Sequence, residues 1–223
     1  KTIPVDSLAW GVISDASFGN AHSGESQGAH AIIAFQKKMF DGVRAPCSVI
    51  AWKSGRIHRV VNSTLAAETQ SLSRGLGELS WVFSVYNEMT DVDFTIEQWE
   101  KKLQDNKVLA MISEESQELL KKGMCIVDAK ALYDHLSKVG VGPSADKRTA
   151  LEMQVVRQNM NAIGAQIRWV PHPKMAVDAL TKKGGKMDSL YELIQTGEYM
   201  IRAETDELVD KKSERERLGY NRR

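Results

Sequence analysis

The sequence has few cysteines and no long run of apolar residues. Its two cysteines, Cys47 and Cys125, lie far apart, each in an apolar segment, with no CxxC pair and no metal-binding spacing. This pattern argues against a zinc site or a disulfide framework and favours buried, reduced thiols in an intracellular protein. No segment is long and apolar enough to cross a membrane, and the N-terminal region lacks the apolar block of a signal peptide.

The sequence also lacks an excess of charge of either sign. It has 223 residues, with 30 Lys and Arg against 29 Asp and Glu, for a net charge of +1. Any binding of nucleic acid must therefore come from a local basic face. Because the chain starts at Lys1 rather than at a methionine, we expect it to be a piece of a longer protein.

Hydrophobic periodicity predicts an α/β fold. Three strand-like runs joined by short turns predict an antiparallel meander, and a long amphipathic helix follows them. Two further strands alternate with helices, which predicts a mixed sheet with helices on its faces. The expected strands are 9–18, 29–38, 43–54, 124–128 and 166–171, and the expected helices are 63–89, 131–139, 147–165 and 174–183.

The composition divides the chain into three parts. Residues 1–183 form the predicted domain, and a polar helical insert occupies 91–122, with helical patches around residues 99–103 and 115–120. Residues 184–223 form a charged, helical C-terminal extension that we expect to pack loosely. Within the domain, Trp52 and Trp169 are expected in the core, and Leu151 and Val155 are among the apolar positions of the helix over 147–165.

Four acidic residues stand in apolar sequence. Asp15 lies in mid-strand, Glu68 in the first turns of the long helix, Asp128 at the end of a strand and Asp178 in the segment "AVDAL". If the strands of Asp15 and Asp128 are parallel neighbours, both side chains lie at the sheet edge where ligands bind. Clustered carboxylates stay ionised only beside a cation, and oxygen ligands select Mg²⁺ or Mn²⁺. Two such ions hydrolyse phosphodiesters.

Each acid also has an ordinary explanation. Asp128 could form a turn or cap a helix, Glu68 could complement the helix dipole, and Asp178 could be an exposed helix residue. Asp15 is harder to explain in this way, because the interior of a strand disfavours aspartate. Taken together, the four acids favour a metal site.

Six segments resemble the ribonuclease H domains of copia-type retrotransposon polyproteins, in the order seen there: "SDAS", "IAWKS", "NSTLAAET", "CIVDAKAL", "DKRTALEMQVVRQ" and "RWVP…VDALTK". The resemblance covers Ala9 to Lys183. It implies a ribonuclease H-like fold with a five-stranded mixed sheet flanked by helices. It also implies a two-metal endonuclease that cuts the RNA strand of RNA–DNA hybrids, leaves a 5′-phosphate, and works with the reverse transcriptase portion of the same polyprotein.

The resemblance also assigns roles at the site. It places the ligands of two Mg²⁺ or Mn²⁺ ions on Asp15, Glu68, Asp128 and Asp178. One ion would be held mainly by Asp15 and Asp178, and the other by Asp15, Glu68 and Asp128. His172 resembles the mobile histidine of cellular ribonucleases H, which assists proton transfer and product release. The alternative is an ordinary surface histidine.

Substrate contacts are expected beside these acids. Polar side chains could read the 2′-hydroxyl of RNA, and basic side chains could hold phosphates. The polar candidates could instead cap helices or turns, and the basic ones could form a solvated face. The polar candidates are Ser17, Asn62, Ser63 and Thr64, and the basic ones are Lys53, Arg56, His58, Arg59, Lys147 and Arg148.

Three other functions compete with this one. The first is a catalytically inactive ribonuclease H-like module that binds nucleic acid or scaffolds a reverse transcriptase. The presence of all four acids argues against it. The second is another metal nuclease of the same fold, an integrase or an exonuclease, against which "AWKS" and "VDALTK" favour ribonuclease H. The third is a purely structural interaction domain, which leaves Asp15 unexplained.

Overall fold

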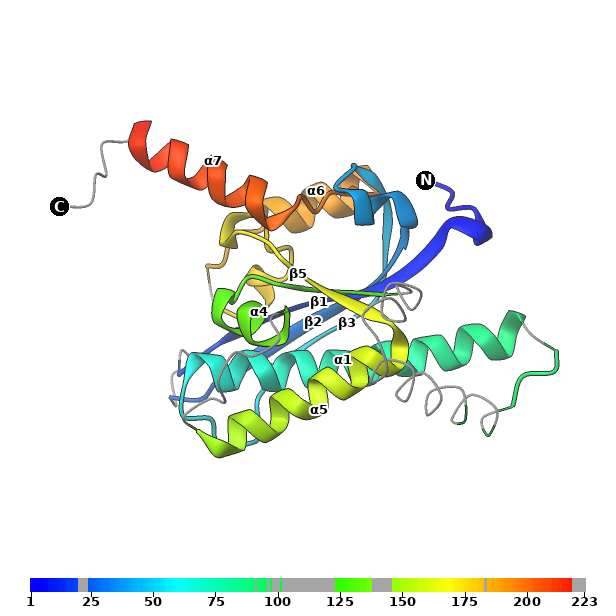
Figure 1. Cartoon of the computed structure of the whole chain (residues 1–223), viewed down its shortest axis with the longest axis horizontal. Helices are drawn as coiled ribbons and strands as arrows, with labels where there is room; N and C mark the ends of the chain where they lie inside the picture. Colours follow the sequence, from blue (N-terminus) through cyan, green and yellow to red (C-terminus); the bar gives the residue numbers. More distant parts are fainter. Residues whose placement is uncertain are drawn as a thin grey trace.

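One mixed sheet forms the centre of the computed structural model, with helices on both of its faces (Figure 1). The structure describes residues 1–19, 24–90, 92–95, 97, 101, 123–137, 146–182 and 184–217. The strands are β1 (Leu8–Ser17), β2 (Gln27–Gln36), β3 (Ala45–Arg56), β4 (Gly123–Val127), β5 (Ala165–Trp169) and β6 (Glu198–Tyr199). The helices are α1 (Thr64–Thr90), α4 (Lys130–Ser137), α5 (Lys147–Ile163), α6 (Asp188–Thr196) and α7 (Glu204–Arg217).

The order of the strands in the sheet is β5-β4-β1-β2-β3-β6. Strands β1, β2 and β3 form the predicted antiparallel meander, and β4 and β5 run parallel to β1. This arrangement confirms the predicted ribonuclease H-like fold. The sheet has six strands instead of five, because the short β6 pairs with the start of β3 at Ala45 and Pro46.

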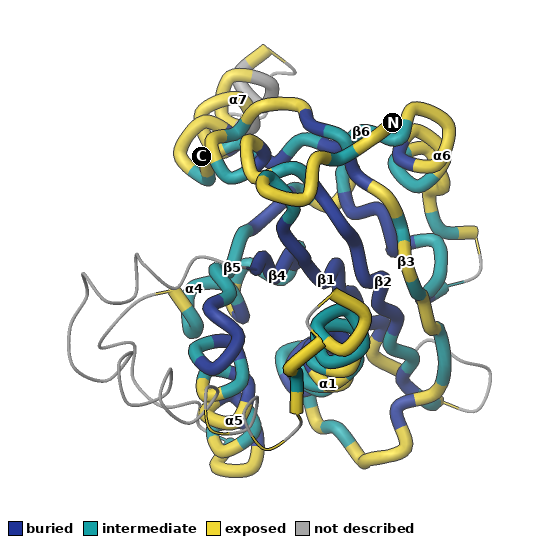
Figure 2. Tube along the Cα trace, turned by 90° about the vertical axis from the view of Figure 1, so that its right-hand side faces the viewer, coloured by how far each residue is buried: buried dark blue, intermediate teal, exposed yellow. Residues whose placement is uncertain are grey.

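Apolar side chains fill both faces of the sheet. Figure 2 shows α1 and α5 on one side of the strands and α6 and α7 on the other. On the α1 side, Val12 and Ile32 pack with Leu72, Leu76 and residues of α4 and α5. Both cysteines are free and buried, and burial raises the pKa of each thiol to about 12. Among the helices that the structure describes, none has an apolar stretch that could span a membrane.

The C-terminal extension packs more closely than expected. Leu193 in α6, Tyr199 in β6 and Ile201 are buried in the same apolar cluster as Phe35 of β2. Helix α7 is attached by two ion pairs, both 2.5 Å long. Glu204 pairs with Lys130 and the buried Glu207 with Lys174. The expectation of loose packing is therefore wrong for residues 188–207, because a few well-placed apolar side chains suffice to anchor them.

Other local predictions also need correction. The expected helix over 174–183 is replaced by two 3₁₀ turns, η3 (His172–Lys174) and η4 (Asp178–Leu180). Trp169 is buried as expected, whereas Trp52 is 65 % exposed because nothing in the described chain covers its part of β3. Apart from Lys101, the patches predicted in the insert lie outside the described residues.

Helix α1 approaches the sheet closely at Gly75. A Cβ atom on Gly75 would lie 2.7 Å from Val12 Cγ2 and 3.2 Å from the Cβ of His30. These neighbours belong to β1 and β2 and are buried, so they have little room to move. Gly77, two residues further along the same helix, has open space where a Cβ would stand.

We predict opposite effects of alanine at these two glycines. Gly75→Ala should lower the free energy of unfolding by about 1–2 kcal/mol, because overpacking against Val12 outweighs the gain in helix propensity. Gly77→Ala should raise it by up to about 1 kcal/mol, because only the propensity changes. Urea denaturation of both variants checks this. Equal effects would contradict the close approach of α1 to β1.

Candidate metal centre

Strand register brings Asp15 and Asp128 side by side. Ile13 of β1 is paired with Ile126 of the parallel strand β4. Two residues beyond each partner come Asp15, near the end of β1, and Asp128, just after β4. The indole Nε1 of Trp169 donates a hydrogen bond of 2.8 Å to the backbone oxygen of Asp128, which fixes the turn after β4.

Helix α1 brings Glu68 to the same place. Glu68 lies in the second turn of α1, one turn before Ser71. The Ser71 hydroxyl lies 2.9 Å from the backbone oxygen of Asp15 and 3.2 Å from that of Ala29, and 3.1 Å from the Ser14 hydroxyl. These buried contacts hold α1 against β1 and β2 and so set the position of Glu68.

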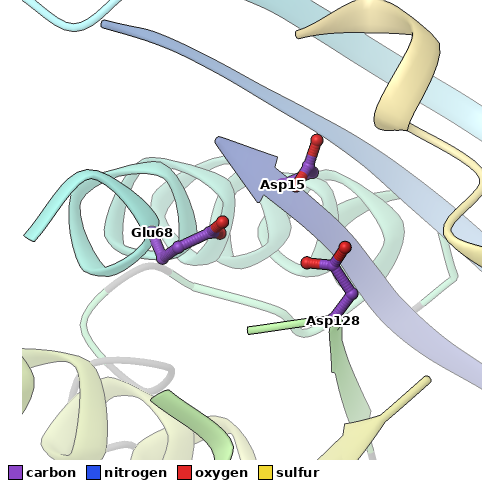
Figure 3. Close-up of side chains that lie close together, drawn as sticks. All are labelled: Asp15, Glu68 and Asp128. Atoms are coloured by element: carbon purple, nitrogen blue, oxygen red, sulfur yellow. The ribbon is translucent and has the colours of Figure 1, made fainter. Parts of the chain in front are cut away.

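The carboxylates of Asp15, Glu68 and Asp128, here called the carboxylate trio, converge on one point (Figure 3). Each offers an oxygen atom, and these atoms all lie within 4.8 Å of one another. Asp15 and Glu68 are both only 3 % exposed. In the part of the chain that the structure describes, the buried Glu68 Oε2 has no hydrogen-bond partner. Oxygen ligands gathered in this way, one of them without a donor, fit a hard divalent cation.

The trio is strained electrostatically without a cation. Burial, together with the negative charge of Asp128, raises the pKa of Asp15 to about 6, against a smaller opposing effect of the Thr181 hydrogen bond. Burial and the charges of Asp15 and Asp128 raise the pKa of Glu68 well above its usual value. Such raised pKa values of Asp15 and Glu68 indicate that a positive charge at this place would favour the ionised forms of both carboxylates.

Asp178 lies beside the trio but outside it. Among the described residues, the acids whose oxygens come within 4.8 Å of one another do not include Asp178. It is buried in η4, and its charge helps to raise the pKa of Asp15. Its Oδ1 lies 2.5 Å from Lys182 Nζ and 3.4 Å from His172 Nε2. The fourth predicted ligand is therefore near the other three and paired with an ammonium group.

Thr181 ties η4 to β1, and the sequence analysis missed it. Its hydroxyl donates to Asp15 Oδ2 at 2.6 Å, and its backbone oxygen accepts a hydrogen bond of 2.7 Å from the buried Ser17 hydroxyl. Lys182 was missed as well, although its spacing of four residues from Asp178 is a usual spacing for an ion pair. Neither residue type signals a site by itself, and only the fold shows which acids they face.

His172 faces the acids and not only the solvent. Its Nδ1 lies 2.8 Å from Asp128 Oδ2, and its side chain is 52 % exposed. The imidazole thus contacts one member of the trio directly and Asp178 more loosely, and it stays open to solvent. A group in this position can exchange protons with water while it touches the site.

Of the four polar residues predicted to contact the substrate, two make hydrogen bonds within the protein and two are exposed. The Ser17 hydroxyl is buried and donates to Thr181, and the Ser63 hydroxyl accepts from the backbone N–H of Ala66 at the start of α1. Thr64, the first residue of α1, is exposed. Asn62 is exposed and lines a cavity of about 430 Å³.

All of the predicted basic residues except Lys147 line one of two cavities. Arg59 and Arg148 line the 430 Å³ cavity with Asn62, and Arg59 pairs with Glu152 at 3.0 Å. A second cavity, of about 450 Å³, has a different set of basic lining residues, Lys53, Arg56, His58 and Arg74. The two cavities share no lining residue. Lys147, at the start of α5, is exposed and lines neither of them.

Comparisons with known proteins add two structural likenesses. No protein-family model matches this chain, and no curated protein sequence matches it. RNase H1 from the halophilic archaeon Halobacterium salinarum NRC-1 is similar over 77 % of this chain and 93 % of that one, with 13 % identity and a TM-score of 0.44. The N-terminal RNase H domain of rv2228c from Mycobacterium tuberculosis is similar over 77 % and 95 %, with 14 % identity and a TM-score of 0.43. The order and directions of the strands, rather than these likenesses, define the fold.

We predict that stability without metal falls as the pH rises. The pKa of Asp15 is raised from 3.8 to about 6 by folding, so deprotonation opposes folding between these values. In a chelator, the free energy of unfolding should drop by about 2 kcal/mol from pH 4 to pH 6, out of about 3 kcal/mol for the whole pKa shift. Glu68, whose pKa is also raised, should extend the drop to higher pH. Urea denaturation at several pH values measures it. If the free energy of unfolding of Asp15→Asn depends on pH in the same way as that of the wild type, Asp15 is not the cause of the drop.

We also predict that Lys182 stabilises the protein in the absence of metal. Lys182→Met removes the ammonium group 2.5 Å from the buried Asp178 carboxylate. The free energy of unfolding in a chelator should fall by about 1–2 kcal/mol, a value reduced from that of a fully buried pair because Lys182 is partly exposed. Lys186→Met is the matched control, because the Lys186 side chain is exposed. If Lys182→Met and Lys186→Met unfold at the same temperature, the ion pair between Lys182 and Asp178 does not stabilise the protein.

Proposed function

We propose that this protein is a two-metal endoribonuclease that cuts the RNA strand of RNA–DNA hybrids during reverse transcription of a copia-type retroelement. The observation that carries the proposal is the carboxylate trio, with Asp15 and Asp128 at the ends of β1 and β4 and Glu68 on α1, and with one oxygen atom of each within 4.8 Å of the others. The retroelement and the reverse transcriptase partner come from the sequence resemblance. The nuclease chemistry is supported by the trio together with the fold.

The residues present suit such chemistry. Asp15, Glu68 and Asp128 would hold a divalent cation, and Asp178 would contribute to a second when Lys182 moves away. Mg²⁺ or Mn²⁺, when bound, supplies positive charge that acidifies water and stabilises the negative charge developing on a phosphodiester. Hydrolysis then forms a bond from water oxygen to phosphorus and breaks the bond from phosphorus to the 3′ oxygen. The products are a 5′-phosphate and a 3′-hydroxyl.

His172 is the proposed proton carrier. Its Nδ1 contacts Asp128, and its half-exposed ring can exchange protons with the solvent. An imidazole nitrogen can both donate and accept a proton, so the ring can deliver a proton to the departing 3′ oxygen and regain one from water. Lys182 Nζ lies 3.5 Å from His172 Nε2, whereas Asp128 contacts the other ring nitrogen, Nδ1.

The 430 Å³ cavity is the proposed grip on the hybrid. Arg59 and Arg148 supply cations, and Asn62 supplies an amide beside the start of α1. Phosphates set the position of a nucleic acid on a protein, so this cavity would fix which phosphodiester reaches the trio. Thr64, exposed at the first turn of α1, remains the candidate for a contact with a 2′-hydroxyl.

One observation favours the alternative, a catalytically inactive binding or scaffold module. Lys182 already neutralises Asp178, so one of the four acids has its positive partner within the protein. Among the described ion pairs, no lysine or arginine pairs with an acid of the trio. The one basic partner there is His172, beside Asp128. The two functions differ in a single measurable property, which is cleavage.

We predict that the purified protein with Mg²⁺ or Mn²⁺ cuts the labelled RNA of an RNA–DNA hybrid and leaves duplex DNA intact. Glu68→Gln and Asp15→Asn should each lower the rate by at least about 100-fold, because each removes a ligand charge. Gel electrophoresis of the labelled strand measures this, with and without a chelator.

Glu88→Gln is the matched control for Glu68→Gln, because Glu88 is exposed on the same helix. It should cut at the wild-type rate. If the folded wild-type protein binds the hybrid and never cuts it in either metal, the inactive module is the correct function. If Asp15→Asn instead fails to fold, Asp15 is structural.

A further inference from the structure

The second cavity lies away from the carboxylate trio, between strands β2 and β3 and the middle of α1. It has a volume of about 450 Å³ and is lined by residues of these elements. Its charged lining groups are Lys53, Arg56 and Arg74, with Glu78 as the acid, and His58 stands among them. Because Glu25 pairs with Arg56, Lys53 and Arg74 remain against Glu78, and the balance at this cavity is still positive. The net charge of the whole chain, +1, does not reveal this local positive charge.

A buried histidine without a partner lines the same cavity. His30 of β2 is 4 % exposed, and within the described residues its Nε2 has no hydrogen-bond partner. Burial lowers the pKa of His30. The charge of Glu78 opposes this effect, and the smaller effects of Lys53 and Arg74 add to it. A buried polar atom left unpaired is costly, and it marks a place where a ligand or water completes the bonding.

The cations are held in place around this histidine. Lys53 is the cross-strand partner of His30 in the pairing of β2 with β3. Arg74 Nη1 donates a hydrogen bond of 2.9 Å to the backbone oxygen of Arg56, so α1 is joined to β3 at the cavity. The Arg56 guanidinium is paired with Glu25. Across the described ion pairs, Lys53 has no acidic partner, and its ammonium group is exposed.

We propose that this cavity binds a phosphate group, from a nucleic-acid backbone or from a free nucleotide. Arginine and lysine are the usual donors to phosphate, and the histidine can add one further hydrogen bond. Ser71 lies between this cavity and the carboxylate site, because it lines the cavity and its hydroxyl contacts the backbone of Asp15. This cavity therefore adjoins the metal centre, but none of the carboxylate trio lines it and it shares no lining residue with the 430 Å³ cavity, so phosphate binding here does not require cleavage.

Gly77 allows a sharp test, because it lines the cavity and a Cβ on it meets no atom within 4 Å. Gly77→Glu adds a carboxylate there, and Gly77→Ala is the matched control. Inorganic phosphate, a nucleoside monophosphate and a short single-stranded DNA are each titrated into the full chain without divalent cations. The imidazole NMR signals of His30 and calorimetry report binding. Lys53→Gln serves as a second variant if Gly77→Glu melts below the wild-type temperature.

We expect at least one probe to shift the His30 signals, with the affinity reduced at least 10-fold by Gly77→Glu or Lys53→Gln and unchanged by Gly77→Ala. A response to all three probes identifies a general phosphate site, and a response to DNA alone, weakened by salt, identifies a backbone phosphate. No shift with any probe, or equal affinity in Gly77→Glu, Lys53→Gln and wild type, overturns the proposal. Glu68→Gln should bind as the wild type does, so a failure of the proposed nuclease function would leave this result unaffected.

Discussion

The mutual repulsion of three buried carboxylates is the constraint on which this structure depends. Two unit charges 4–5 Å apart at a protein surface repel by about 4 kcal/mol, and the trio contains three such pairs. The surrounding chain resists this repulsion through contacts to the carboxylates, from Thr181 to Asp15 and from His172 to Asp128, and through hydrogen bonds to the backbone of the same acids. Ser71 holds the backbone of Asp15, and Trp169 holds that of Asp128. The acids are thus fixed in place, and among the described residues Glu68 Oε2 has no hydrogen-bond partner and remains available to a cation.

Two sites of opposite charge lie along α1. Its second turn carries Glu68 of the carboxylate trio, and its middle faces the cavity with Lys53, Arg56 and Arg74. Ser71 stands at the boundary, and the close approach of the helix at Gly75 leaves no room for water between α1 and β1 at that point. A phosphate-rich ligand on the basic side and cations on the acidic side would each be bound without competing for the same surface.

The sequence predicted the antiparallel meander and the mixed sheet, because both follow from apolar runs and short turns. It left open whether the strands of Asp15 and Asp128 are parallel neighbours, and the structure shows that they are. The sequence could not show Thr181 or Lys182, whose roles depend on where the loop after β5 folds back. Helix α5 buries Met153 and Val156 and leaves Leu151 largely exposed, since two apolar faces compete on it and only contact with α1 decides between them. Strand β6 has two residues, too few for any periodic signal.

The attachment of α7 has a practical consequence. Glu204 pairs with Lys130, which lies two residues after Asp128. Glu207 pairs with Lys174, which lies two residues after His172. Tyr199 adds a hydrogen bond of 2.7 Å from its hydroxyl to the backbone oxygen of Lys174. A shortened protein ending at residue 183 would lose these restraints and would bare the apolar cluster around Phe35. Inactivity of such a fragment would reflect loosened loops, and it would not show that the tail takes part in the chemistry.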